Sequence, residues 1–180
     1  MSKHKFRALD VCFIAVFVAV IAALAQVTVP LPLGVPLSLQ SFAVALAGAV
    51  LGAKKGSIAV LVYLVLGAVG APVFVGFGGG FHRIIGPWGG YLLSYPLFAF
   101  SAGFGADKNR KFPLFFGLLI GTALNLTMGT LQLAFVNSLS LRDAFLAGML
   151  PFIAGDMLKL VAVFFITPPL RTVMQKAGAN

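Results

Sequence analysis

The sequence predicts an all-α integral membrane protein with six transmembrane helices in a single domain covering residues 1–180. Of the 180 residues, 60% are hydrophobic and 9% are charged, and the mean hydropathy is +1.04. A soluble domain carries about 25% charged residues. The apolar character continues to the C-terminus, so the chain is not a polar secreted domain behind a signal peptide. The third observation is the regular alternation of basic and uncharged connections described below.

Six apolar segments are candidates for the spans. A helix needs about 20 apolar residues to cross the hydrocarbon core, and fewer when neighbouring helices bury it. The second and third segments are short and are separated by Lys54, Lys55 and Gly56, so a re-entrant course is the alternative for either. The expected spans are 8–25, 39–53, 56–69, 89–106, 113–136 and 147–168.

Basic residues alternate between the connections of these segments. Two arginines, Arg83 and Arg142, lie in one set of connections. The other set and the two ends hold ten basic residues: Lys3, Lys5, Arg7, Lys54, Lys55, Lys108, Arg110, Lys111, Arg171 and Lys176. Positive charge marks the cytoplasmic side, so both termini are expected there. This distribution also argues that the net charge of +9 anchors the protein in the bilayer and does not bind nucleic acid.

Two of the three loops expected outside, 26–38 and 70–88, are themselves apolar, unlike 137–146. The first contains three prolines and no charge, and the second is rich in glycine and aromatic residues. A water-exposed loop is normally polar. A lid over a pocket is the favoured interpretation. The alternative is simple anchoring at the interface, to which Trp88, Tyr91 and Tyr95 would contribute.

An aspartate and a lysine lie within the last span, Asp156 and Lys159. Either charge at the centre of a membrane helix costs roughly 2.5–3.5 kcal/mol. Their i, i+3 spacing puts them on one helix face. They either form a salt bridge that locks helix packing or line a cavity that binds a polar ligand. Ionisable residues inside a membrane favour the second interpretation.

The fifth segment adds a polar stripe of Thr122, Asn125 and Gln132, which share one face of a helix. These residues either hydrogen-bond neighbouring helices or contact a ligand. Gln40 and Arg83 are weaker candidates of the same kind.

The first segment carries Ala15, Ala19 and Ala23 at four-residue spacing. Small residues in this pattern allow close helix approach. The face serves either internal packing or docking to a partner in the bilayer.

Several kinds of chemistry have no residues to support them. The chain has no GxxxxGK[ST] phosphate loop, GxSxG elbow or HExxH pair. It has two histidines, four acidic residues and one cysteine, Cys12, which excludes a cysteine metal cluster or an intramolecular disulfide. We therefore expect no enzyme activity, no cofactor and no metal site.

The order of several motifs resembles the BioY family, the biotin-specific S components of energy-coupling factor transporters. The motifs are "VPLPLGVPLSLQSFAV" (29–44), "LGAVGAPVFVGFGGG" (66–80), "GPWGGYLLSYP" (86–96) and "PFIAGDMLK" (151–159).

The resemblance implies a six-helix S-component fold in the plasma membrane that captures biotin from outside. It also implies a transmembrane coupling protein and two cytoplasmic ATPases as partners, which explains the missing phosphate loop. In the family, the aspartate and lysine matching Asp156 and Lys159 contact the ligand. The small-residue face, here Ala15 and Ala19, contacts the coupling protein.

The resulting hypothesis is that Asp156 and Lys159 engage the polar groups of biotin. Gln40 and Tyr91 add hydrogen bonds or packing, Phe77, Phe81 and the 26–38 loop close over the bicyclic ring, and Arg83 and Asn125 complete the candidate site.

Three alternatives remain open at this point. One is an S component for another vitamin, such as thiamine or riboflavin. Another is a stand-alone secondary transporter with Asp156 as a proton or cation site. The third is a structural membrane subunit that binds no ligand.

Overall fold

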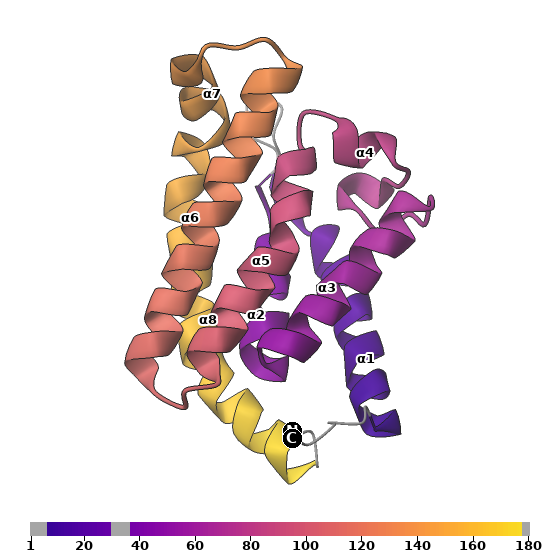
Figure 1. Cartoon of the computed structure of the whole chain (residues 1–180), viewed down its shortest axis with the longest axis vertical. Helices are drawn as coiled ribbons and strands as arrows, with labels where there is room; N and C mark the ends of the chain where they lie inside the picture. Colours follow the sequence, from indigo (N-terminus) through magenta and orange to yellow (C-terminus); the bar gives the residue numbers. More distant parts are fainter. Residues whose placement is uncertain (1–6, 30–36, 178–180) are drawn as a thin grey trace, which may run out of the picture.

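The computed structural model describes residues 7–29 and 37–177, and helices dominate it (Figure 1). The helices are α1 (Ala8–Ala25), α2 (Gln40–Leu51), α3 (Ala53–Ala68), α4 (His82–Ile85), α5 (Gly89–Ala106), α6 (Lys111–Val136), α7 (Leu141–Gly148) and α8 (Leu150–Lys176). A 3₁₀ turn, η1 (Val75–Phe77), and two short strands, β1 (Thr28–Val29) and β2 (Leu37–Ser38), complete the described elements.

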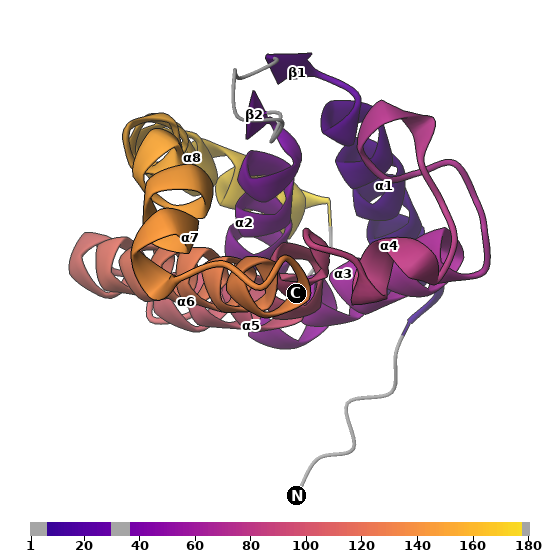
Figure 2. The ribbon, with the colours of Figure 1, turned by 90° about the horizontal axis from the view of Figure 1, so that it is seen from above.

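Helix α2 occupies the middle of the bundle when the molecule is seen from above (Figure 2). Ten of its twelve residues are buried. Glycines make this packing possible, because a Cβ atom added at Gly48, Gly56 or Gly103 would overlap the backbone of a neighbouring helix. Small residues at such crossings are typical of membrane helix bundles, where backbones approach closely.

Most of the expected segments coincide with helices. Segments 8–25 and 89–106 match α1 and α5, and 113–136 matches α6 except for two residues at its start. Within the described residues, three helices are long and apolar enough to cross a bilayer by length and composition, namely α1, α6 and α8. Helix α2 rises about 18 Å, which is shorter than a hydrocarbon core of about 30 Å.

The break between the second and third segments lies earlier than expected. The helices meet at Gly52, whose φ of +85° suits glycine. Lys54 and Lys55 therefore belong to the first turn of α3 and not to a connection. Two adjacent lysines indicated a loop, but lysine also forms helices well.

The expected 147–168 segment corresponds to parts of two helices. Helix α7 starts after Ser140, whose Oγ accepts a hydrogen bond of 3.1 Å from the Asp143 N–H. Helix α8 then runs from Leu150 through Pro168 and Pro169 to Lys176. Proline is tolerated inside membrane helices when neighbouring groups compensate for the lost hydrogen bond, so it is a poor stop signal here.

One end of the molecule gathers the start of α1, the α2–α3 junction, the α5–α6 turn and the end of α8 (Figure 1). Two ion pairs connect them, Asp10 to Lys55 and Asp107 to Arg171, each at 2.6 Å. The N–H of Ala53 also donates to Asp107 at 3.1 Å. We call this the basic end, because it carries Lys54, Lys55, Lys108, Arg110, Lys111, Arg171 and Lys176.

The opposite end holds the three connections expected outside the membrane. Strands β1 and β2 pair antiparallel, with Thr28 opposite Ser38 and Val29 opposite Leu37. They form the base of the first loop, and residues 30–36 of that loop lie outside the described residues. These strands and an isolated bridge between Phe74 and Gly78 are the β structure among the described residues. The β-branched Thr28 and Val29 favour such pairing. The second connection contains η1 and α4, and the third contains the start of α7.

Candidate ligand-binding site

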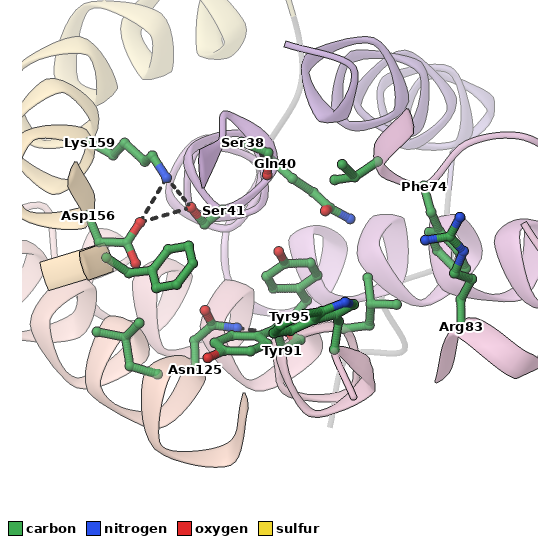
Figure 3. A pocket seen from close by; sticks show the side chains of 15 residues that line it. Ser38, Gln40, Ser41, Phe74, Arg83, Tyr91, Tyr95, Asn125, Asp156 and Lys159 are labelled. Carbon is green, nitrogen blue, oxygen red and sulfur yellow. Dashed lines mark hydrogen bonds and ion pairs between the residues drawn. The ribbon is translucent and has the colours of Figure 1, made fainter. Parts of the chain in front are cut away.

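A cavity of about 220 Å³ lies between the central helix α2 and helices α5, α6 and α8 (Figure 3). The second connection and α4 form its remaining wall. Eight of the fifteen lining side chains are aromatic or aliphatic, and the other seven are polar or charged. The lining residues are Ser38, Gln40, Ser41, Phe74, Val75, Arg83, Trp88, Tyr91, Leu92, Tyr95, Asn125, Leu126, Phe152, Asp156 and Lys159. This combination is typical of a small-molecule site.

Three side chains form a charged triangle on one side of the cavity (Figure 3). Lys159 Nζ donates to Asp156 Oδ1 at 2.9 Å and to Ser41 Oγ at 3.0 Å. Ser41 Oγ in turn donates to Asp156 Oδ1 at 3.2 Å. Because Asp156 and Lys159 are one helical turn apart on α8 and Ser41 comes from α2, the triangle also joins the two helices.

The triangle leaves hydrogen-bonding capacity for a ligand. Only Oδ1 of Asp156 is engaged by the described residues, which leaves Oδ2 as an acceptor. Lys159 uses two of its three donors. The side chains of Asp156 and Lys159 are 8% and 11% exposed. The pair forms a salt bridge and also lines the cavity, so the salt bridge does not prevent these side chains from facing a ligand.

A second polar group comes from Asn125 on α6. Its Nδ2 donates to the carbonyl oxygen of Tyr91 at 3.0 Å and to Ser94 Oγ at 2.7 Å. Its Oδ1 makes no hydrogen bond with the described residues and is a further acceptor. Tyr91 lines the cavity beside it, and the Tyr91 hydroxyl donates to the carbonyl oxygen of Gly148. Asn125 is thus fixed in orientation by its amide nitrogen.

Thr122 and Gln132, the other two residues of the polar stripe on α6, have different surroundings. Thr122 is buried with 3% exposure. Gln132 Nε2 donates to the carbonyl oxygens of Ile84 and Gly86, at 2.9 and 2.8 Å, and so holds the α4 connection. Within the stripe, Asn125 therefore lines the cavity, whereas Gln132 makes structural hydrogen bonds to the α4 connection.

Two glutamines support the segment Val73–Phe77, which we call the roof. Gln40 Nε2 donates to the Tyr63 hydroxyl at 2.6 Å, and that hydroxyl donates to the carbonyl oxygen of Val73 at 3.0 Å. Gln26, at the end of α1, donates to the carbonyl oxygen of Phe74 at 3.1 Å and accepts from the Phe77 N–H at 2.8 Å. The roof is therefore bonded to both α1 and α3.

Arg83 lies across the cavity from the charged triangle (Figure 3). All four aspartates of the chain are within the described residues, and none forms an ion pair with Arg83. Asp10, Asp107 and Asp156 pair with other basic residues, and Asp143 bonds to Ser140. Of the two cations in the cavity, Lys159 is therefore neutralised by Asp156, whereas Arg83 has no carboxylate partner in the described chain.

The structure brings six of the seven proposed ligand contacts to this one cavity: Gln40, Arg83, Tyr91, Asn125, Asp156 and Lys159. The seventh, Phe77, lies outside the lining and is 72% exposed, and Phe81 is also exposed. Phe74 and Val75 line the cavity from the same segment. The φ angles of Gly76 and Phe77, +68° and +54°, turn the chain after Val75, which sequence periodicity does not reveal.

The sequence contains only weak signals for the other residues that line the cavity. Ser41 follows Gln40 in an apolar helix without any pattern that marks it as an ion-pair partner. Tyr95 is 5% exposed and lines the cavity with Trp88, so these aromatic residues line the site and are not simple interfacial anchors. Within the described residues, no cluster of three or more His, Cys, Asp or Glu side chains could hold a metal ion.

The small residues of α1 face away from the bundle. Ala15, Ala19 and Ala23 are exposed, whereas Ile14, Val18 and Ile21 are buried against the neighbouring helices. Internal packing is therefore not the role of this alanine face.

The sequence profile of the BioY family matches residues 1–176. The chain belongs to the BioY family. Similar proteins include the probable biotin transporter of Pyrococcus horikoshii, which is 41% identical over 132 residues, or 73% of this chain and 78% of that protein. The biotin transporter of Thermotoga maritima is 38% identical over 133 residues, again 73% and 78% of the two chains.

A solved structure agrees with this family assignment. The crystal structure at 2.1 Å of the S-component for biotin from an ECF-type ABC transporter superposes with a TM-score of 0.84. The match covers 96% of this chain and 95% of that one at 28% identity. This BioY-family chain is therefore a multi-pass membrane protein with the fold of that S component.

Proposed function

We propose that this BioY-family chain is the biotin-binding S component of an energy-coupling factor transporter. The observation that supports it is the cavity, in which a charged triangle and Asn125 lie on one side and Arg83 on the other. Biotin is proposed as the ligand because the relatives are named as biotin transporters and the S component with the same fold is one for biotin.

The chemistry of biotin matches this arrangement of groups. Its ureido ring has two N–H donors and one carbonyl acceptor, its thiophane ring is apolar, and its tail ends in a carboxylate. Asp156 Oδ2 and Asn125 Oδ1 are acceptors for the two N–H groups, and the remaining Lys159 donor serves the carbonyl. Tyr91 and Phe152, with ring centroids 6.1 Å apart, provide an apolar surface for the bicyclic ring.

The carboxylate of biotin then belongs at Arg83. A buried carboxylate needs a cation, and Lys159 is already neutralised by Asp156. The guanidinium group of Arg83 binds carboxylates through paired N–H donors. Biotin therefore lies with its ring at α8 and its tail at α4, and Gln40 supports the roof above it without needing a direct contact.

The membrane arrangement in this proposal has six spans, α1, α2, α3, α5, α6 and α8, in one domain. Two observations support it. The described chain starts and ends at the basic end (Figure 1), as an even number of spans requires. Basic residues gather on the cytoplasmic side of membrane proteins, so the basic end faces the cytoplasm and the cavity opens toward the outside.

The partners in this proposal are a transmembrane coupling protein and two cytoplasmic ATPases. The exposed alanine face of α1, with Ala15 and Ala19 at its centre, is the surface for the coupling protein. The chain itself carries no phosphate loop, so energy from ATP has to come from other subunits.

A titration with a panel of vitamins tests the function. Trp88 is the single tryptophan and lines the cavity, so its fluorescence reports ligand binding directly. We expect biotin to change the emission and to give calorimetric heat, and thiamine and riboflavin to give neither. Binding of another vitamin in place of biotin would contradict the ligand assignment. Ion-driven biotin uptake by the protein alone in liposomes would favour a secondary transporter.

Arg83→Ala tests the orientation of biotin in the cavity. The substitution is expected to weaken biotin binding about 10- to 100-fold, because a charge-assisted hydrogen bond contributes roughly 1.5–3 kcal/mol. Biotinamide, which lacks the charge of the tail, should bind wild type and Arg83→Ala with affinities within about twofold. Calorimetry on the four combinations gives the coupling between Arg83 and the carboxylate. An equal loss for both ligands would place the carboxylate elsewhere.

A further inference from the structure

A second hollow lies on the outer surface of the bundle, between the end of α5 and the start of α6. It measures about 730 Å³ and is separate from the cavity described above, with which it shares no residue. Its walls are Phe100 and Phe104 on α5 and Phe116 and Ile120 on α6, and each is 42–55% exposed. We call it the α5–α6 groove.

Two cations close the groove at the basic end, Lys108 and Arg110 in the turn that joins the helices. Neither forms an ion pair with any of the four aspartates, all of which are described. Lys108 Nζ lies 5.1 Å from the centre of the Phe104 ring, at the edge of the apolar wall. The groove therefore combines apolar walls with two positive charges at the end that lies at the basic end of the molecule.

The length of the groove corresponds to one leaflet of a bilayer. Ile120 lies ten positions after Arg110, and a helical rise of about 1.5 Å per residue makes this about 15 Å. The hydrocarbon core of a bilayer is about 30 Å thick, so this is half of it. A ligand that fills the groove needs an anionic group at the interface and an apolar chain one leaflet long.

We propose that the α5–α6 groove binds an anionic phospholipid of the cytoplasmic leaflet. Lys108 and Arg110 contact its phosphate and headgroup, and an acyl chain lies between Phe104 and Phe116. Charge complementarity supports this occupant over a second copy of the chain, because a second copy would bring another basic end to the same place. Helix α1, which carries the alanine face proposed for the coupling protein, lies on the other side of α2 from α6 (Figure 2).

Lipid titration of the full-length protein tests the site. The delipidated protein in neutral detergent is mixed with dioleoylphosphatidylglycerol or dioleoylphosphatidylcholine, and bound lipid is counted by native mass spectrometry. We expect phosphatidylglycerol to bind at least about tenfold more tightly. Each cation near an anionic lipid strengthens binding by about fivefold, so Lys108→Ala/Arg110→Ala should lose about 25-fold for phosphatidylglycerol and little for phosphatidylcholine.

Two further variants separate this site from general charge attraction. Lys54→Ala/Lys176→Ala removes two charges from the basic end outside the groove and should keep the preference for phosphatidylglycerol. Ile120→Trp fills the α5–α6 groove and should weaken the binding of both lipids. Soluble glycerol phosphate should not compete, because it lacks the acyl chain.

Equal phosphatidylglycerol binding by wild type and Lys108→Ala/Arg110→Ala would overturn the proposal. A wild-type dimer that dissociates in this double variant would also overturn it, because a second copy of the chain would then occupy the groove. Biotin binding, followed through Trp88, should be unchanged in all these variants. Failure of the lipid site is therefore distinguishable from failure of the proposed transport function.

Discussion

Asp156→Asn is expected to lower the affinity for biotin by about 100-fold or more, or roughly 3 kcal/mol. The substitution removes the carboxylate that is proposed to accept from the ligand and leaves the Lys159 ammonium buried without its counter-charge. Breaking a buried ion pair from one side costs about 3–5 kcal/mol. The variant should therefore also unfold at a lower temperature in detergent. Calorimetry measures the first effect and thermal unfolding followed by Trp88 fluorescence measures the second.

A double variant separates binding from folding. Asp156→Asn/Lys159→Met removes both charges, and replacing a buried pair by uncharged residues is often neutral or stabilising. We expect it to regain thermal stability and to remain deficient in biotin binding. The matched control is Asp107→Asn/Arg171→Met, which removes an ion pair of 2.6 Å at the basic end and should keep wild-type affinity. Normal biotin binding by the Asp156→Asn/Lys159→Met variant would show that the pair only holds α8 to α2.

Ala15→Trp and Ala19→Trp are expected to abolish biotin uptake while leaving biotin binding intact. Both positions are exposed on α1, so an indole fits without disturbing the interior but prevents close approach of another helix. Co-purification with the coupling protein should be lost. Uptake of labelled biotin by cells that express the complete transporter measures the effect, and calorimetry on the isolated chain measures binding.

Ala123→Trp is the matched control for this pair, because Ala123 is also exposed but lies on α6. It should keep both uptake and co-purification. Uptake at the wild-type rate by Ala15→Trp and Ala19→Trp would place the coupling surface on another helix.

Polar and charged residues within apolar segments were predictable as site candidates from the sequence, because placing them in a membrane costs free energy. Asp156 and Lys159 stand out in an apolar segment, and their helical spacing implies a shared face; the structure confirms the ion pair. Asn125 was predictable in the same way, as part of a polar stripe. Segments 8–25 and 89–106 were correct in both bounds, because long apolar runs flanked by polar or glycine-rich connections define helices well.

The remaining features depend on tertiary contacts that a sequence pattern does not encode. Ser41 completes the charged triangle only because α2 crosses α8 at that height. Phe74 lines the cavity and Phe77 does not, because the roof turns at Gly76. The sequence alone does not distinguish these two phenylalanines. The helix break at Gly52 depends on its positive φ, whereas the more conspicuous lysines continue into α3.

Gln26 connects the two surfaces on which this protein is proposed to act. It ends α1, whose outer face is the proposed docking surface, and its side chain holds the roof of the cavity through Phe74 and Phe77. A coupling protein that displaces the end of α1 would therefore act on the same hydrogen bonds that shape the proposed biotin site. Thermodynamic linkage makes this effect mutual: the factor by which docking changes biotin affinity equals the factor by which biotin changes docking affinity.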